Sequence, residues 1–164
     1  MGKTRPKICT IGWDPGRINC AYAVYDGDKL KETDVIEGTV DDVLNLQEFG
    51  VRVARVLDWF EPNLCGVERY QLRGRGKGFI GNMEQVNLMI GVIFEQCRQR
   101  GIPCRLVTPS AHKTWAKKFN GAIKGKKKKI DIHTCPEFKH LDTDHEADAA
   151  NIAKYTLTKF MEEQ

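Results

Sequence analysis

The sequence contains no C-x-x-C pair, no long hydrophobic run, no internal repeat and no long linker. Its six cysteines lie mostly within apolar runs, so we interpret them as small, reduced core residues, which indicates a reducing compartment. No stretch is long enough to cross a bilayer, and the N-terminus carries charge but no apolar signal core. These absences predict an intracellular protein without a membrane partner.

The chain has 164 residues, which is enough for one domain with a sizeable core, so we expect a single domain over 1–164. Its 41% hydrophobic and 29% charged residues are typical of a soluble globular protein. The net charge is only +4, but the positive charges concentrate in residues 68–78 and 112–129. Local basic segments in a nearly balanced chain indicate a polyanionic partner.

The hydrophobic periodicity predicts a mixed sheet with helices on its faces. The expected strands are 7–14, 19–26, a third within 29–40, 64–70 and 102–107. The expected helices are 43–60, beginning at Asp41–Asp42, then 81–101 with Gly101 as C-cap, 110–118 and about 144–160. Residues 123–135 have no clear pattern.

The segment 81–101 is apolar on nearly all sides, which is typical of a helix buried on more than one face. One seam contains Met83, Val86, Ile90, Ile93 and Cys97. The remaining apolar residues are Leu88, Met89, Val92 and Phe94. The helix is either a central core helix or is shared with a second subunit, and in the second case we expect Met89 at the centre of the contact.

Carboxylates occur where strands end. In TIGWDPGRINCAYAVYD, Asp14 closes the first strand before a Pro-Gly turn, and Glu68 lies near the end of LCGVERY. Ligands of open sheets bind just beyond strand ends. Asp148 lies in the first turns of the last helix, and His145 precedes it by three residues and shares its face. These four side chains could converge on one site.

Carboxylate oxygens are the ligands that Mg²⁺ prefers, and two such ions about 4 Å apart can support phosphodiester hydrolysis. Other readings of the same residues stay open. Asp14 could be a turn residue, Glu68 could be solvated or ion-paired, and DHEAD could be an acidic first helical turn. The basic segments favour the metal-site interpretation, because a polyanionic substrate and a carboxylate metal site suit one another.

Four motifs in order resemble those of the RuvC-type Holliday junction resolvases, over about residues 7–160. IGWDPGRINCAYAVYD resembles their first motif, CGVERY the second and HEADAANIAKY the third. VTPSAHK resembles the segment with their active-site lysine, which would be Lys113. The similarity is greatest to the poxvirus and iridovirus branch.

The resemblance implies an α/β ribonuclease H-like fold, with a mixed five-stranded sheet flanked by helices, and a homodimer. It implies a metal-dependent endodeoxyribonuclease that resolves four-way and branched DNA in viral recombination and concatemer processing, in the host cytoplasm. The catalytic set would be Asp14, Glu68, Lys113, His145 and Asp148. All but Lys113 would be ligands of Mg²⁺, or Mn²⁺, with two ions per site. The viral enzymes carry Asp at the position of His145, so the neighbouring Asp144 is an alternative ligand.

The basic segments supply candidate DNA contacts. A Gly-rich loop after Glu68 carries Arg73, Arg75, Lys77 and Phe79, and the second cluster comprises Lys124, Lys126, Lys127, Lys128 and Lys129. Phe79 could stack on a base of an opened junction or begin the core of the next helix. The lysine run could instead be a solvated face or a nuclear localisation patch.

Three other functions remain open from the sequence. A phosphotransferase of the actin-like ATPase type also has an Asp-Gly turn between its first strands, but needs two such domains. A ribonuclease acting on RNA–DNA hybrids would use the same fold and metals. A non-catalytic, basic DNA-binding module would keep its function without Asp14.

Overall fold

The computed structural model describes residues 7–16, 18–38, 43–69, 79–125 and 129–164. Its centre is a five-stranded sheet in the order β3-β2-β1-β4-β5. The strands are β1 (Cys9–Pro15), β2 (Asn19–Asp26), β3 (Lys29–Glu37), β4 (Leu64–Glu68) and β5 (Cys104–Val107). The first three form an antiparallel meander, and β4 and β5 extend it in parallel from β1. The expected mixed α/β sheet is confirmed.

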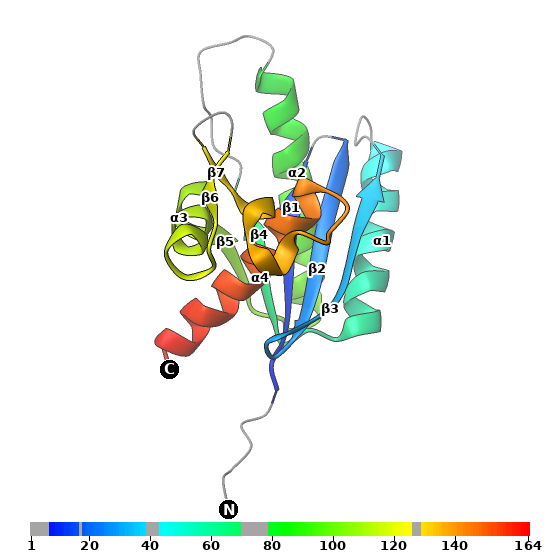
Figure 1. The fold of residues 1–164 in the computed structure, drawn as a ribbon. Coiled ribbons are helices and arrows are strands. Elements are labelled where there is room, and N and C mark those ends of the chain that lie inside the picture. Colours follow the sequence, from blue (N-terminus) through cyan, green and yellow to red (C-terminus); the bar gives the residue numbers. More distant parts are fainter. Residues whose placement is uncertain (1–6, 17, 39–42, 70–78, 126–128) are drawn as a thin grey trace, which may run out of the picture.

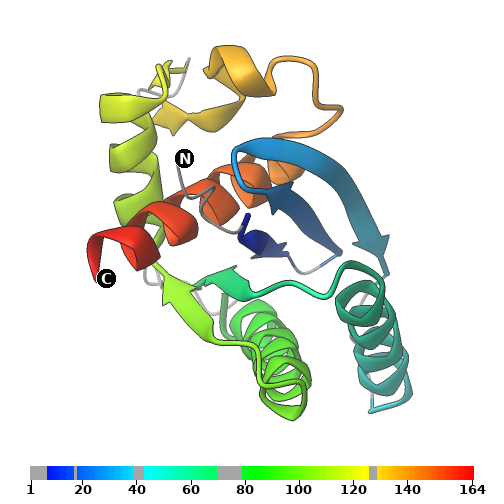
Figure 2. The ribbon, with the colours of Figure 1, turned by 90° about the horizontal axis from the view of Figure 1, so that it is seen from below.

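Helices cover both faces of the sheet (Figures 1 and 2). On one face lie α1 (Val43–Phe60) and α2 (Phe79–Gln99), and on the other lies α4 (Asp144–Glu162) with α3 (Pro109–Phe119) beside it. The unassigned region 123–135 contains a short ribbon of β6 (Ile123–Lys124) and β7 (Ile130–Asp131), followed by the 3₁₀ turns η1 (Ile132–Thr134) and η2 (Pro136–Phe138). The expected helix start at Asp41–Asp42 lies outside the described residues.

Successive side chains of β1 and β4 point to opposite faces of the sheet. Ile11 and Trp13 of β1 and Val67 of β4 are fully buried in the core that α1 and α2 cover. Gly12 and Gly66 point the other way, toward α4. Their lack of a side chain lets α4 lie directly on the strands.

Helix α2 differs in detail from the expectation. Helix α2 begins at Phe79, so this residue does not lie in a loop, and its side chain is outside the described part. The expected C-cap is confirmed, because Gly101 has φ +66° after the last turn. Met89 is 1% exposed and belongs to the core, which overturns its placement at the centre of a subunit contact. Its neighbour Leu88 is 47% exposed and faces outward.

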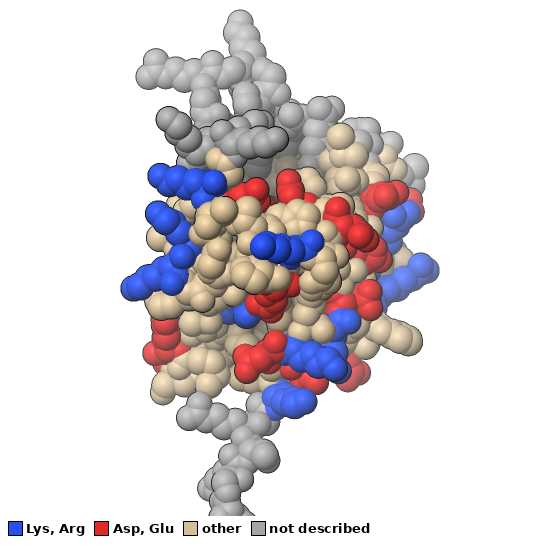
Figure 3. Space-filling model, in the orientation of Figure 1, with Lys and Arg blue, Asp and Glu red and all other residues tan. Residues whose placement is uncertain are grey.

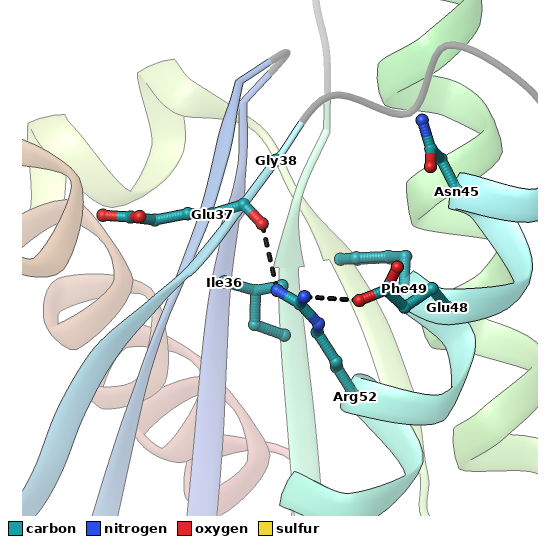
Figure 4. A pocket seen from close by; sticks show the side chains of 7 residues that line it. All are labelled: Ile36, Glu37, Gly38, Asn45, Glu48, Phe49 and Arg52. Carbon is teal, nitrogen blue, oxygen red and sulfur yellow. Dashed lines mark hydrogen bonds and ion pairs between the residues drawn. The ribbon is translucent and has the colours of Figure 1, made fainter.

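A small hollow of about 90 Å³ lies between the end of β3 and α1 (Figure 4). Arg52 of α1 crosses it and donates to the backbone oxygen of Glu37 at 3.1 Å, while also pairing with Glu48. Arg52 therefore ties α1 to the sheet edge.

All six cysteines are free thiols, and four of them are buried, in agreement with the sequence-based interpretation. Within the described ranges, none of the helices combines the length and apolar character that a membrane span requires.

Candidate active site

Two carboxylates lie at neighbouring strand ends of the sheet. Strands β1 and β4 are parallel neighbours whose last paired residues are Trp13 and Val67. Asp14 and Glu68 are the next residues on each strand, and both point to the α4 face because successive side chains alternate. Asp14 is 7% exposed, and its charge acts on that of Glu68. The end of this strand pair therefore brings two acidic groups together, as the sequence predicts.

Helix α4 brings the third carboxylate to the same place. Its N-terminus is fixed by a capping box, in which Thr143 and Glu146 bond to each other's backbone N–H groups. One turn later, Asp148 accepts a hydrogen bond from Nζ of Lys113 on α3, at 3.2 Å. The close approach of α4 to Gly12, two residues before Asp14, sets the depth of this helix over the strand end.

The electrostatics of the cluster are those of crowded, buried acids. Burial and the neighbouring Asp14 raise the pKa of Asp148 to about 6. Burial also raises the pKa of Asp14, against the hydrogen bond from His145. Burial opposes the charge on Lys113, but the carboxylates of Asp148 and Glu68 outweigh it and raise the pKa of this lysine. The cluster is an acidic site that attracts positive charge, and Lys113 supplies one such charge.

His145 and Asp144 were alternatives for the fourth ligand. Nδ1 of His145 lies 2.8 Å from Oδ2 of Asp14, and this hydrogen bond raises the pKa of the imidazole. Asp144 instead contacts Nδ1 of His133 at 2.8 Å, on the exposed side of the helix start. The geometry therefore places His145, rather than Asp144, beside the buried carboxylates.

Sequence reasoning missed a buried histidine behind Glu68. His112 has no exposed surface, and its Nε2 lies 2.6 Å from Oε2 of Glu68. The amide nitrogen of Asn151 lies 2.9 Å from Nδ1 of His112 and donates to the backbone oxygen of the same residue at 3.0 Å. Since that amide nitrogen is the donor, Nδ1 accepts, and the ring proton resides on Nε2 and is donated to Glu68.

In the sequence, His112 and Asn151 are each close to a predicted site residue, and this is the only local hint of their role. His112 directly precedes Lys113, and Asn151 follows Asp148 by three residues on the same helix face. Because the two helices are separated by a long segment, no spacing rule links these residues. Their contact appears only once α3 and α4 pack together.

The chemistry of the donor set suits a hard divalent cation, although ligand atoms from three of these described residues do not all lie within 4.8 Å of one another. Oδ1 of Asp148 is buried without a hydrogen-bond partner, which is costly for a carboxylate oxygen. Asp14 and Glu68 add oxygens of the kind that Mg²⁺ and Mn²⁺ prefer, and His145 adds a nitrogen. A bound cation would give the orphaned oxygen a partner and would relieve the repulsion that raises the pKa of Asp148.

Basic side chains lie next to this cluster. Figure 3 shows Lys and Arg gathered along the edge over α3 and the β6–β7 ribbon. A hollow of about 270 Å³ is lined by Ser110, Lys113 and Thr114 of α3 and by Lys129 beside β7. The other predicted DNA contacts of the lysine run, Lys126, Lys127 and Lys128, lie outside the described residues, as do Arg73, Arg75 and Lys77.

Comparison with known proteins places the fold. No family model matches the chain, and no curated protein sequence matches it either. Among solved structures, RuvC of Thermus thermophilus in complex with a Holliday junction substrate superposes with a TM-score of 0.71 at 20% identity, covering 95% of this chain and 96% of that one. The yeast mitochondrial Holliday junction resolvase Ydc2 superposes with a TM-score of 0.61 at 17% identity, covering 95% of this chain and 80% of that one. The chain therefore has the fold of the RuvC-type resolvases, as the motifs predict.

Proposed function

We propose that this chain is a structure-selective endonuclease that cleaves four-way and branched DNA by metal-dependent phosphodiester hydrolysis. The observation that carries the proposal is the convergence of Asp14, Glu68, Asp148 and Lys113 at one end of a RuvC-type sheet. Acidic groups and a lysine at this place, beside a basic edge, suit a phosphodiester substrate better than a neutral one.

Asp14, Glu68, Asp148 and His145 would hold the divalent cation, expected to be two Mg²⁺ ions. When bound, the ions supply charge neutralisation at the phosphate and lower the pKa of a bound water. The protein residues position the reaction. The Lys113 ammonium, whose pKa is raised by its acidic neighbours, would bind the scissile phosphate, and Asp14 would be kept in place by its buried strand end.

Substrate selectivity separates this proposal from its alternatives. A labelled four-way junction, an RNA–DNA hybrid and a plain duplex of the same sequence should be incubated with equal enzyme in Mg²⁺. We expect paired incisions in the junction and at least about tenfold slower cutting of the other two. Preferential cutting of the RNA strand would favour the ribonuclease, and binding without any cleavage would favour the DNA-binding module. A viral origin and a location in the host cytoplasm remain predictions.

His112 should act as a positioning residue for Glu68. Replacing His112 with Leu removes the only donor that the described residues provide to Oε2 of Glu68, and we expect about 10- to 100-fold slower cleavage and a higher Mg²⁺ requirement. Gln at this position keeps an N–H near the same point and should restore most of the activity. Junction affinity and the melting temperature, measured in parallel, should stay close to wild type for Gln. Equal losses in both variants would contradict the role.

Lys129 and its neighbours should bind phosphate. Replacing Lys126–Lys129 with Ala should weaken junction binding and reduce the slope of log K against log salt concentration by about 0.9 for each phosphate that is no longer neutralised. Lys159 is the matched control, because it pairs with Glu162 at the far end of α4. Lys159→Ala should leave the slope unchanged. An unchanged slope for the lysine run would mean that it does not touch DNA.

We further propose that the enzyme is a homodimer joined through the α1–α2 face, because a four-way junction has two-fold symmetry and needs two opposed incisions. A groove of about 480 Å³ runs between these helices and is lined by Leu46, Val51 and Val92 among others. Leu88, one turn before Val92, continues the apolar surface and is 47% exposed.

Leu88→Glu should give a folded monomer that cannot make paired incisions, since two like charges would meet in a desolvated contact. Met89→Glu is the contrasting variant and should fail to fold, because it places a charge in the core. Light scattering gives the mass and circular dichroism the fold. A dimer that survives Leu88→Glu would place the interface elsewhere.

A further inference from the structure

Three cysteines from distant parts of the chain meet beneath the sheet, on the face opposite the carboxylates. Cys65 of β4 and Cys104 of β5 are direct cross-strand neighbours, and Cys97 reaches them from the last turns of α2. The three sulfur atoms all lie within 4.8 Å of one another, and those of Cys65 and Cys104 are 3.3 Å apart. We call this group the thiol triangle.

We propose that the thiol triangle is a binding site for one thiophilic metal ion of the Zn²⁺ or Cu⁺ class. Thiolates are the protein ligands that select these ions over Mg²⁺. Tetrahedral coordination with Zn–S bonds of about 2.3 Å places sulfurs about 3.8 Å apart, so the three sulfurs need to move by only about 1 Å or less. The site is therefore nearly preformed.

Zn²⁺ and Cu⁺ bind thiolates, so the three thiols of the triangle must be deprotonated in the complex. Each thiol that carries a proton releases it to solvent as its metal–sulfur bond forms. The complex with Zn²⁺ then carries a net charge of −1. The guanidinium of Arg100 lies near Cys97 but is already paired with Asp58.

The partly exposed Cys104 gives the ion a route of entry, since Cys65 and Cys97 are fully buried. Among the described residues, no fourth His, Cys, Asp or Glu offers a ligand atom within the same distance. Three-coordinate Cu⁺ needs none, whereas Zn²⁺ would take a water at the Cys104 side. In either case the bound ion would link the end of α2 to β4 and β5.

The test uses the reduced, metal-free full chain under anaerobic conditions, with Zn²⁺, Cu⁺ and Co²⁺ as separate probes. Native mass spectrometry should show one Zn²⁺ or Cu⁺ retained by the triangle, and an excess of about 100 times the Kd should raise the melting temperature by about 5–10 °C. Co²⁺ should give a thiolate-to-metal charge-transfer band in the near ultraviolet, which oxygen ligands at the carboxylate cluster do not produce. The stronger of the Zn²⁺ and Cu⁺ arms identifies the preferred ion.

Cys97→Ala and Cys104→Ala should each lose the charge-transfer band and the thermal shift. Cys135→Ala is the control, because Cys135 is as buried as Cys97 but lies in the core on the other face of the sheet. It should keep both signals even if its melting temperature without metal falls. Absence of the band in the wild-type protein, or its persistence in both triangle variants, would overturn the proposal.

Discussion

Replacing Asp148 with Asn should slow cleavage of a four-way junction by about 10³-fold or more, equivalent to about 4 kcal/mol of lost transition-state stabilisation. The substitution removes a charge from the centre of the acidic cluster and supplies an amide nitrogen, which repels a cation, in place of one carboxylate oxygen. Junction binding should change by less than about twofold, because phosphate contacts with the basic edge supply most of the affinity. Asp14→Asn and Glu68→Gln should behave alike.

Asp144→Asn is the matched control for these variants. It removes a carboxylate from the same helix, but this one pairs with His133 on the exposed side. Cleavage by this variant should remain near wild type, measured with saturating Mg²⁺ under single-turnover conditions. Near-normal cleavage by any of the three cluster variants would remove that residue from the proposed metal site, and a large loss in the control would bring Asp144 into it.

The second large effect concerns the close contact between α4 and β1 at Gly12. Gly12→Ala should lower the free energy of unfolding by about 3 kcal/mol, the upper part of the usual range for overpacking. A Cβ at this position would lie 2.3 Å from the backbone oxygen of Ala149 and 2.5 Å from the backbone nitrogen of Ala153. Since backbone atoms cannot rotate aside as a flexible side chain would, α4 must move away from β1, and Asp148 moves with it.

Gly91→Ala tests the same chemical change without the clash. Gly91 is exposed in α2, and a Cβ there would meet nothing within 4 Å. The substitution should stabilise the protein by about 1 kcal/mol, because alanine favours the helix. Urea unfolding followed by circular dichroism measures both variants. Equal effects of the two alanines would mean that α4 does not depend on the close approach at Gly12.

Much of the fold was predictable because its strands are bounded by strong local signals. The apolar run into Asp14, the Pro-Gly turn and the short run before Glu68 fix two strand ends. Parallel pairing then leaves little choice about where these carboxylates point. The sequence could also place Asp148 near the start of the last helix, because acidic residues are favoured in a first helical turn.

The parts that escaped prediction depend on how helices rotate and pack. In α2, apolar residues occupy nearly every face, so the sequence could not tell that Met89 points inward and Leu88 outward. The His112–Asn151 contact requires α3 to lie against α4, which no local pattern specifies. The thiol triangle was likewise hidden, since Cys65 and Cys104 become neighbours only through the parallel pairing of β4 and β5.

The central claim is that the carboxylate cluster uses a divalent cation to cut branched DNA. One measurement tests it most directly: a four-way junction, labelled on each strand in turn, is incubated with the purified wild-type protein in Mg²⁺ and, in parallel, with a chelator. The proposal predicts paired nicks in opposed strands near the branch point with Mg²⁺, and an intact, still bound junction with chelator. Cleavage that persists in chelator, or no cleavage with Mg²⁺ or Mn²⁺ despite tight binding, would contradict it.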